Sequence, residues 1–392
     1  MRRIELLLPL LGVGGLFAVA GCGESEVRAL RVETLVGGLD TPWDLVWGPD
    51  GHLWFSERDG RISRLDPVSG ALEIVAEIDV LQVLESGLLG LAFHPDFERE
   101  PWVYAVHSYD IEGELTLDAD GLAPEQVRAE AERRIRNRLV RMRYDGAELG
   151  EPQVLLDDIP GRFDHNGSRL VVGPDGHLYM TTGDAGRSEL ARDPGSPAGK
   201  ILRLTLEGQP APGNPFDSIV YSLGHRNPQG LAFHPGHGSL YATEHGASEN
   251  DELNRIAAGA DYGWPLVRGF CDGDWADEEV HCDEHPIVEP VHAWTPTLGI
   301  AGIDVHSGAG VPAWEGDLLV TSLRAATLHR LELSDDGGSV VDSETILEEE
   351  YGRLRDVLVG PGGELYVATS NRDGRGLPGP TDDRILRVTF QP

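Results

Sequence analysis

Residues 164–186, DHNGSRLVVGPDGHLYMTTGDAG, contain the local pattern from which we predict the fold of this chain. An apolar run (RLVV) is followed by a Gly-Pro-Asp-Gly turn and a second run (LYMTT) with aromatic and β-branched residues. Two short runs joined by such a turn predict a β-hairpin. His165 lies just ahead of the first run and Asp184 follows the second, so the hairpin would bring these two side chains together.

The hairpin pattern recurs along the chain, in copies that span residues 44–60, 89–109, 169–184, 230–246, 356–374 and, in a more diverged form, 303–323. Several copies are followed by a third strand-like run, such as GRISRLD or GKILRLTL. Each unit is then a small antiparallel sheet that cannot bury its own faces, whereas six of them arranged radially cover one another. We therefore predict an all-β fold, a six-bladed β-propeller of four-stranded antiparallel sheets.

One segment, residues 123–144, departs from the repeat. Its first half is rich in helix-forming and charged residues, which predicts a surface insertion in the second blade. Its end has the composition of a strand, so we expect the sheet to resume there.

The composition supports many short strands and limits the partners. The chain has 392 residues, among them 50 Gly and 26 Pro, which favour turns over long helices. Its formal net charge of −34 argues against binding nucleic acid or anionic lipid through a broad surface, because the basic patch that neutralises phosphates is missing. The acidity serves either solubility, as in a salty habitat, or the gathering of cations.

The N-terminal sequence MRRIELLLPLLGVGGLFAVAGC has a basic start, an apolar stretch and small residues before Cys22. This predicts a signal peptide over 1–22 with a lipobox, lipidation at Cys22, a tether over 23–31 and one propeller domain over 32–392. The expected location is an exported, periplasmic or cell-surface lipoprotein anchored to a membrane through Cys22. A simple secreted form and an uncleaved anchor are the alternatives.

Cys271 and Cys282 flank an acidic loop, CDGDWADEEVHC. In an oxidising compartment, two cysteines that close so short a loop predict a disulfide. Three nearby histidines, His281, His285 and His292, make a zinc site the alternative.

Function in a propeller concentrates on the loops around the mouth of its central channel. Arg226, Arg324, Arg353 and Arg355 all precede or follow hairpin copies, so we expect them to converge there. Arginine forks suit planar carboxylates or phosphates, which predicts an anion site, although each arginine alone could be a surface ion-pair partner. His165 beside such an anion, backed by Asp184, could act as a general base; alternatively it is a loop histidine bonded to backbone.

From about residue 32 to 389 the chain resembles the soluble quinoprotein sugar dehydrogenases, the PQQ-dependent glucose and aldose sugar dehydrogenase family of six-bladed propellers. The motifs that carry the resemblance are TPWDLVWGPDGHLWFSER, GLLGLAFHPDF, HNGSRLVVGPDGHLYMTTGDAG, GHRNPQGLAFHP, EHGASENDELN, DYGWP, GRLRDV and DDRILRV. The resemblance implies hydride transfer from an aldose to PQQ, with a lactone as product and Ca²⁺ as a second cofactor.

The resemblance also implies roles for single residues. His165 would remove the proton of the anomeric hydroxyl, and Asp184 would hold its ring. The residues implied for the quinone and its carboxylates are Arg226, Asn227, Arg353, Arg355 and Arg324, the last at a position where family members commonly have Lys. The residues implied for calcium are the carbonyls of Gly246 and Ala247 against the quinone, with Glu252 and Tyr262 at a structural calcium site.

The substrate side differs from the glucose enzyme. Glu85 and Glu189 replace sugar-contacting Gln residues, whereas Asp164 matches a sugar-contacting acid. The long loop that shapes the glucose pocket has no counterpart, which implies a more open site and looser aldose selection. The expected partners are an aldose and an external electron acceptor, with no nucleic acid, and the chain is expected to be a monomer or a homodimer.

Two other functions fit a propeller of this kind. A calcium-dependent sugar lactonase would need a carboxylate-lined metal at the channel and no arginine cluster. A surface-anchored propeller that binds a glycan or a protein would not need His165, Asp184, Arg353 and Arg355 together.

Overall fold

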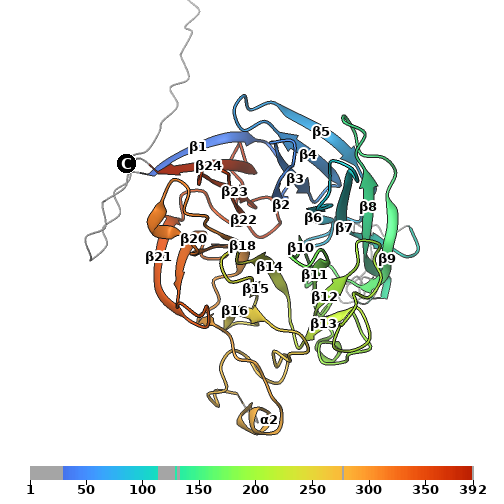
Figure 1. Cartoon of the computed structure of the whole chain (residues 1–392), viewed down its shortest axis with the longest axis vertical. Coiled ribbons are helices and arrows are strands. Elements are labelled where there is room, and N and C mark those ends of the chain that lie inside the picture. The colour runs from blue at the N-terminus through green and yellow to red at the C-terminus, as the bar shows by residue number, and fades with distance from the viewer. Residues whose placement is uncertain (1–29, 114–128, 130–132, 276–277, 391–392) are drawn as a thin grey trace, which may run out of the picture.

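The computed structural model describes residues 30–113, 129, 133–275 and 278–390. These residues form six four-stranded antiparallel sheets around one centre, which confirms the predicted six-bladed β-propeller (Figure 1). The predicted signal peptide, Cys22, the tether up to residue 29 and most of the first half of 123–144 lie outside the described residues. The end of that segment is a strand, as predicted.

The blades follow one another along the chain, each starting with its innermost strand. Blade 1 consists of β2(Pro42–Trp47), β3(Leu53–Glu57), β4(Arg61–Leu65) and β5(Leu72–Glu77). Blade 2 consists of β6(Leu88–Phe93), β7(Trp102–Asp110), β8(Ile135–Arg143) and β9(Gln153–Pro160). Blade 3 consists of β10(Gly167–Val172), β11(Leu178–Thr182), β12(Lys200–Leu204) and β13(Val220–Leu223). Blade 4 consists of β14(Pro228–Phe233), β15(Leu240–Glu244), β16(Asp251–Ile256) and β17(His292–Trp294). Blade 5 consists of β18(Ile300–Val305), β19(Leu318–Ser322), β20(Thr327–Leu333) and β21(Val340–Glu348). Blade 6 consists of β22(Leu354–Val359), β23(Leu365–Thr369), β24(Arg384–Phe390) and β1(Leu30–Gly37).

The ring is closed by two strands from opposite ends of the chain. β1 is the outermost strand of blade 6 and pairs antiparallel with β24, with Leu30 opposite Phe390 and Val32 opposite Val388. Residues 30 and 31, expected at the end of the tether, therefore belong to this strand.

The hairpin register places the start of each innermost strand beside the end of the second strand. Gly167 lies opposite Thr182 in blade 3, and Pro228 lies opposite Glu244 in blade 4. We call this edge of the ring the N-edge, because the innermost strands begin there. Loops before the first strand and after the second strand of every blade therefore meet at one end of the channel.

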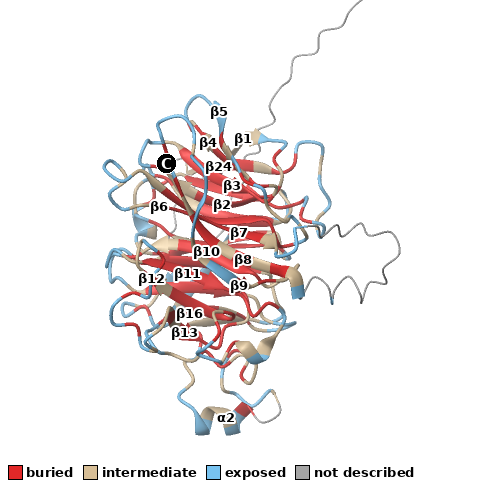
Figure 2. Ribbon diagram, turned by 90° about the vertical axis from the view of Figure 1, so that its right-hand side faces the viewer, coloured by how far each residue is buried: buried red, intermediate tan, exposed pale blue. Residues whose placement is uncertain are grey.

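The core lies between the faces of neighbouring blades. Trp54 and Ile62 of blade 1 pack with Leu91, Val103 and Met142 of blade 2, and all five side chains are buried. Buried residues follow the strands, and exposed residues gather in the loops at the two edges (Figure 2). Each blade thus buries its faces on its neighbours, as the repeat predicted.

The innermost strands approach one another closely enough to require glycine. A Cβ added to Gly90 in β6 would lie 2.1 Å from the carbonyl oxygen of Ser168 in β10. A Cβ on Gly302 in β18 would lie 2.0 Å from Asp356 Oδ1 in β22. A side chain at either position would push adjacent blades apart.

A buried ionic cluster joins the innermost strands. Arg169 Nη1 donates to Asp44 and, at 2.9 Å, to Asp356 Oδ2, and its Nε donates to the carbonyl of Gln229 at 3.0 Å. Asp44 also accepts the backbone N–H of Leu91 at 2.8 Å. The cluster ties β2, β6, β10, β14 and β22 together across the centre of the ring.

A short helix, α2(Glu278–Glu284), projects from blade 4 at the rim (Figure 1). Cys282 in this helix forms a disulfide with Cys271, as predicted. Their sulfur atoms are bonded to each other and are therefore not metal ligands. None of the helices in the described part of the chain has the length and hydropathy to span a membrane.

Candidate functional site

The residues singled out in the sequence gather at the N-edge. Within three residues before an innermost strand or after a second strand lie Glu85, Asp164, His165, Asp184, Arg226, Asn227, Gly246, Ala247, Arg324 and Arg353. Arg355 lies inside β22, and Glu252 lies in β16 opposite Glu244. The register of the hairpins, rather than proximity in sequence, brings this set to one end of the channel.

His165 and Asp184 form a hydrogen-bonded pair. His165 Nδ1 lies 2.7 Å from Asp184 Oδ1, and Asp184 also accepts the N–H of Gly186 at 2.7 Å and Trp264 Nε1 at 2.9 Å. Burial alone would raise the pKa of Asp184, but these hydrogen bonds outweigh it and hold the pKa below its ordinary value. The ionised carboxylate has only acceptors, so Nδ1 carries the proton and Nε2 is the basic nitrogen. The His165 side chain is 18% exposed, which leaves it accessible.

Arg226 is held beside this pair. Its backbone N–H donates to Glu244, its Nη1 donates to the carbonyl of His245 at 3.1 Å, and its guanidinium carbon lies 5.3 Å from the centre of the Trp264 ring. Burial lowers the pKa of Arg226. Trp264 therefore contacts both Asp184 and Arg226, and links the histidine pair to the first of the arginines.

Two further arginines share one carboxylate. Arg353 donates from Nε at 2.9 Å and from Nη2 at 2.7 Å to Asp373 Oδ2, and Arg355 Nη2 lies 3.7 Å from the same oxygen. Arg355 Nη1 also donates to Gln229 Oε1 at 3.0 Å. Burial lowers the pKa of Arg355 to about 9, so it remains a cation at neutral pH.

Several buried donors at the N-edge have no hydrogen-bond partner within the described residues. Among them are Arg58 Nε and Nη1, Arg226 Nε, Asn227 Nδ2 and Arg355 Nε. Buried polar atoms are normally paired, and an unpaired donor costs free energy. A ligand with several anionic or carbonyl acceptors would satisfy these atoms, so the site fits a planar polycarboxylate quinone.

Sequence reasoning missed Arg58, His245 and Asp373. Arg58 and His245 are each the first residue after the second strand of their blade, following Glu57 and Glu244, and this shared position is the signal that could have found them. Burial lowers the pKa of His245 to about 4, so its imidazole is neutral at physiological pH. Asp373 gives no sequence signal, because its role depends on arginines that reach it from another loop.

The residues predicted for calcium offer backbone and carboxylate oxygens. Gly246 and Ala247 follow β15, and burial, reinforced by the charge of Glu244, raises the pKa of Glu252 to about 8. The Tyr262 hydroxyl is engaged with backbone atoms, so Tyr262 could contribute only its carbonyl to a metal. No group of three or more His, Cys, Asp or Glu side chains in the described ranges is placed to hold a metal, so a calcium site would depend on carbonyl oxygens.

The remaining predicted residues are less enclosed. Asp164 Oδ1 lies 3.5 Å from Arg162 Nε, and burial raises its pKa. Arg324 is exposed and donates to Thr297 Oγ1 at 3.0 Å. Glu189 is exposed in the short 3-10 helix that follows the hairpin of blade 3.

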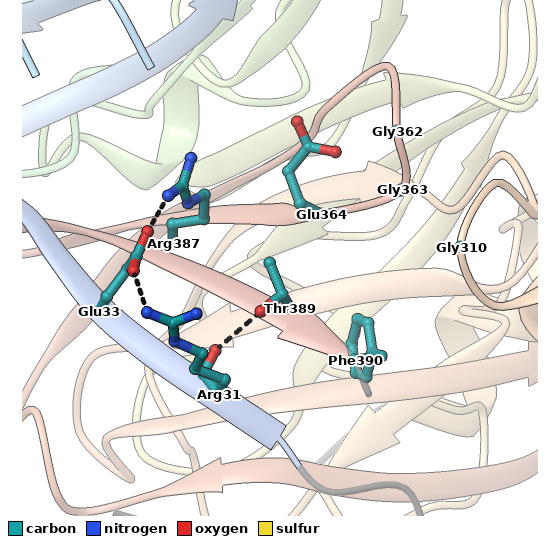
Figure 3. A pocket seen from close by; sticks show the side chains of 9 residues that line it. All are labelled: Arg31, Glu33, Gly310, Gly362, Gly363, Glu364, Arg387, Thr389 and Phe390. Atoms are coloured by element: carbon teal, nitrogen blue, oxygen red, sulfur yellow. Dashed lines mark hydrogen bonds and ion pairs between the residues drawn. The ribbon is translucent and has the colours of Figure 1, made fainter. Parts of the chain in front are cut away.

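A pocket of about 300 Å³ lies elsewhere, on blade 6 (Figure 3). The residues that line it are Arg31, Glu33, Gly310, Gly362, Gly363, Glu364, Arg387, Thr389 and Phe390. Three of its four charged side chains pair with one another, Glu33 with Arg31 and Arg387, and Glu364 accepts the hydroxyl of Tyr366 at 3.0 Å. None of the predicted site residues lines it, so it is separate from the N-edge site.

Comparison with known proteins identifies the family of the chain. The family model described as glucose/sorbosone dehydrogenase matches residues 39–385. Quinoprotein glucose dehydrogenase B of Acinetobacter calcoaceticus is 30% identical over 417 residues, with 86% of this chain and 84% of the relative covered.

Two solved structures extend the comparison. The PQQ-bound aldose sugar dehydrogenase of Streptomyces coelicolor superimposes with a TM-score of 0.75 and 36% identity, covering 93% of this chain and 98% of that chain. The apo-form of the soluble aldose sugar dehydrogenase of Escherichia coli gives a TM-score of 0.74 and 25% identity, covering 92% and 99%. The chain described here therefore belongs to the glucose/sorbosone dehydrogenase family, a family of oxidoreductases.

Proposed function

We propose that the protein oxidises aldose sugars to lactones with PQQ and Ca²⁺ as cofactors. The observation that carries this proposal is the set of buried, unpaired donors on Arg58, Arg226, Asn227 and Arg355 beside the His165–Asp184 pair. A sugar lactonase or a glycan-binding propeller has no need for such donors. The quinoprotein and PQQ-bound relatives support the same cofactor.

In this proposal His165 is the general base. Its Nε2 accepts the proton of the anomeric hydroxyl, while the C–H bond at the same carbon gives up a hydride and the carbonyl of the lactone forms. Asp184 fixes the tautomer that leaves Nε2 basic and stabilises the charge that the ring acquires. When bound, PQQ supplies the electrophilic quinone that accepts the hydride.

The cationic residues are proposed to hold the cofactor. Arg353, Arg355 and Arg324 would pair with its carboxylates, and Arg226 with Asn227 would contact the quinone. The carbonyls of Gly246 and Ala247 would hold Ca²⁺ next to it, where the metal adds positive charge to the acceptor side of the reaction. Glu252 and the carbonyl of Tyr262 would belong to a second, structural calcium site.

Asp164 and Glu85 are proposed to face the sugar, and the electrons would pass on to an external acceptor. We infer from the sequence that the protein is exported and anchored through a lipidated Cys22. Replacing Cys22 by Ser should abolish incorporation of labelled fatty acid into the protein, and labelling of the Cys22→Ser variant would contradict lipidation at Cys22.

The decisive experiment uses the protein without its predicted signal peptide, stripped of metals. PQQ and Ca²⁺ are added singly and together, and dye reduction is followed with a panel of aldoses. We expect turnover only with both additions. His165→Ala should abolish turnover and leave PQQ binding intact, whereas His177→Ala, in the turn at the opposite end of the same hairpin, should retain activity.

The alternative outcomes separate the rival functions. A protein that binds no PQQ would overturn the assignment and favour a glycan- or protein-binding propeller. Hydrolysis of a sugar lactone with Ca²⁺ alone would favour the lactonase.

A further inference from the structure

Arg375 is an arginine at the N-edge that none of the family motifs includes. It lies in the loop after β23, and its side chain is 48% exposed. Its Nη1 lies 2.7 Å from Glu85 Oε1, and its backbone N–H donates to Asp373 Oδ1 at 2.9 Å. Since Asp373 also binds Arg353, the loop that carries Arg375 is anchored in the arginine cluster.

Glu85 connects Arg375 to the backbone of the base. Its Oε2 accepts the N–H of His165 at 3.0 Å, and its own N–H donates to the carbonyl of Phe163 at 2.9 Å. The neighbouring Ser86 Oγ donates to the carbonyl of Arg162 at 2.6 Å. Residues 85 and 86 therefore hold the segment that precedes β10 at three points.

The backbone of His165 needs this support. Its φ is 56°, in the left-handed region that a residue with a Cβ rarely adopts. Such a conformation persists only where surrounding contacts determine it. The hydrogen bond from His165 N–H to Glu85 is such a contact, and it acts while Nδ1 is bound to Asp184 on the other side.

We propose that Arg375 is a positioning residue: by pairing with Glu85 it keeps the Glu85 carboxylate in place to hold the His165 backbone, and so aims the imidazole at the sugar. This inference rests on the proposed function, because it assigns His165 the role of base. Under this proposal, the residue that positions the base lies in the loop after β23 of blade 6, whereas the base, His165, precedes β10 of blade 3.

The charges around Glu85 support this role. Besides Arg375 and His165, the charged or titratable groups that face Glu85 are Arg58, Asp164, Arg226, His245 and Arg355. Burial alone would raise the pKa of Glu85, but the positive charge of Arg375, followed by the neighbouring imidazoles of His245 and His165 and the His165 N–H bond, lowers it to about 2. When Arg375 is removed, the largest contribution that lowers the pKa of Glu85 is lost, so this pKa rises.

A Gln at position 85 would remove the dependence on Arg375. The amide oxygen of Gln can accept the His165 N–H without a cation beside it, because it carries no charge to compensate. Glu85→Gln therefore keeps an acceptor for the His165 N–H and separates the effect of Arg375 on Glu85 from any other effect of Arg375.

The test is a double-mutant comparison in the PQQ- and Ca²⁺-loaded protein. Arg375→Ala should lower kcat by up to about 100-fold, the loss typical of a displaced catalytic group, and should move the acid limb of the kcat profile to higher pH. Arg375→Lys should recover part of the loss. In the Glu85→Gln background, Arg375→Ala should leave kcat and the acid limb unchanged. Arg372→Ala, an exposed arginine of the same loop that donates to the carbonyl of Asp382, is the matched control.

A second measurement does not depend on turnover. Hydrogen exchange of the peptide containing His165 should be faster in Arg375→Ala than in the wild type, and equal in the two Glu85→Gln proteins. Equal effects of Arg375→Ala in both backgrounds, or none in either, would overturn the inference. Absence of wild-type turnover with a retained difference in exchange would instead overturn the proposed function alone.

Discussion

Asp184 accepts hydrogen bonds from three donors, and its role depends on a carboxylate with acceptors only. In Asp184→Asn the amide can donate to Nδ1, so the ring can bind in the tautomer whose Nε2 carries the proton and cannot act as a base. We expect kcat to fall by about 10²- to 10⁴-fold, the usual contribution of a general base, with PQQ affinity unchanged. Steady-state kinetics and a PQQ titration check this.

The matched control is Asp175→Asn, at the opposite end of the same hairpin. Asp175 binds Arg203 and Tyr179, far from the N-edge. An equal loss of kcat in both variants would mean that Asp184 acts through hairpin stability rather than through His165.

Arg355 combines a buried guanidinium with an Nε donor that has no partner within the described residues. Burial lowers its pKa, but a guanidinium keeps its proton in proteins, so Arg355 offers the cofactor a lasting positive charge.

Arg355→Met should bind PQQ at least about tenfold more weakly at neutral pH, since a hydrogen bond to a charged group contributes about 1.5–3 kcal/mol. Equilibrium titration of PQQ measures the loss. Equal affinities of the wild type and the variant would contradict the role of Arg355 in holding the cofactor.

The close approach of the innermost strands limits which residues can replace glycine in them. Gly90→Ala would place a methyl group 2.1 Å from the carbonyl oxygen of Ser168 in the adjacent blade, so β6 and β10 would have to separate. We expect the free energy of unfolding to fall by about 1–3 kcal/mol, as for other overpacked sites. Gly150→Ala, where the nearest atom is 3.6 Å away, should leave it unchanged or slightly increased. Denaturant titration of both variants measures the difference, and equal stabilities would contradict the close approach.

The elements themselves could be predicted from the sequence because each strand and turn is specified locally. All six hairpin copies, including the diverged one at 303–323, became the first two strands of a blade. His165 with Asp184 was predictable for the same reason, since one hairpin holds both. The pairing of Glu85 with Arg375 was not, because it joins loops of blades 2 and 6 that only the closed ring brings together. The cluster around Arg169 escaped prediction because its members lie inside strands whose residues resemble ordinary core positions.

The net charge of −34 causes electrostatic repulsion between the carboxylates of the folded molecule, and cations should weaken this repulsion. NaCl should therefore raise Tm. At constant ionic strength, binding of Ca²⁺ to the folded state should raise Tm further. A Ca²⁺ concentration of 100 times its Kd should add about 2.7 kcal/mol to the free energy of unfolding. Glu252→Gln should reduce the calcium increment and keep the NaCl effect. Glu207→Gln, exposed in the turn after β12, should keep both. Differential scanning calorimetry distinguishes these cases, and an unchanged calcium increment in Glu252→Gln would exclude it as a ligand.

The closure of blade 6 by β1 and β24 has a consequence for how the molecule is made. Leu30 and Phe390 are register partners, so β1 leaves the ribosome before the other described strands and cannot pair until β24 has been translated. Until then the nascent chain can fold blades 1 to 5, but the faces of blades 1 and 5 that blade 6 covers in the closed ring remain exposed. Translation of β24 therefore allows the whole ring to close. A chain that loses β24 would be left as an unclosed arc, with apolar surface exposed to chaperones and proteases.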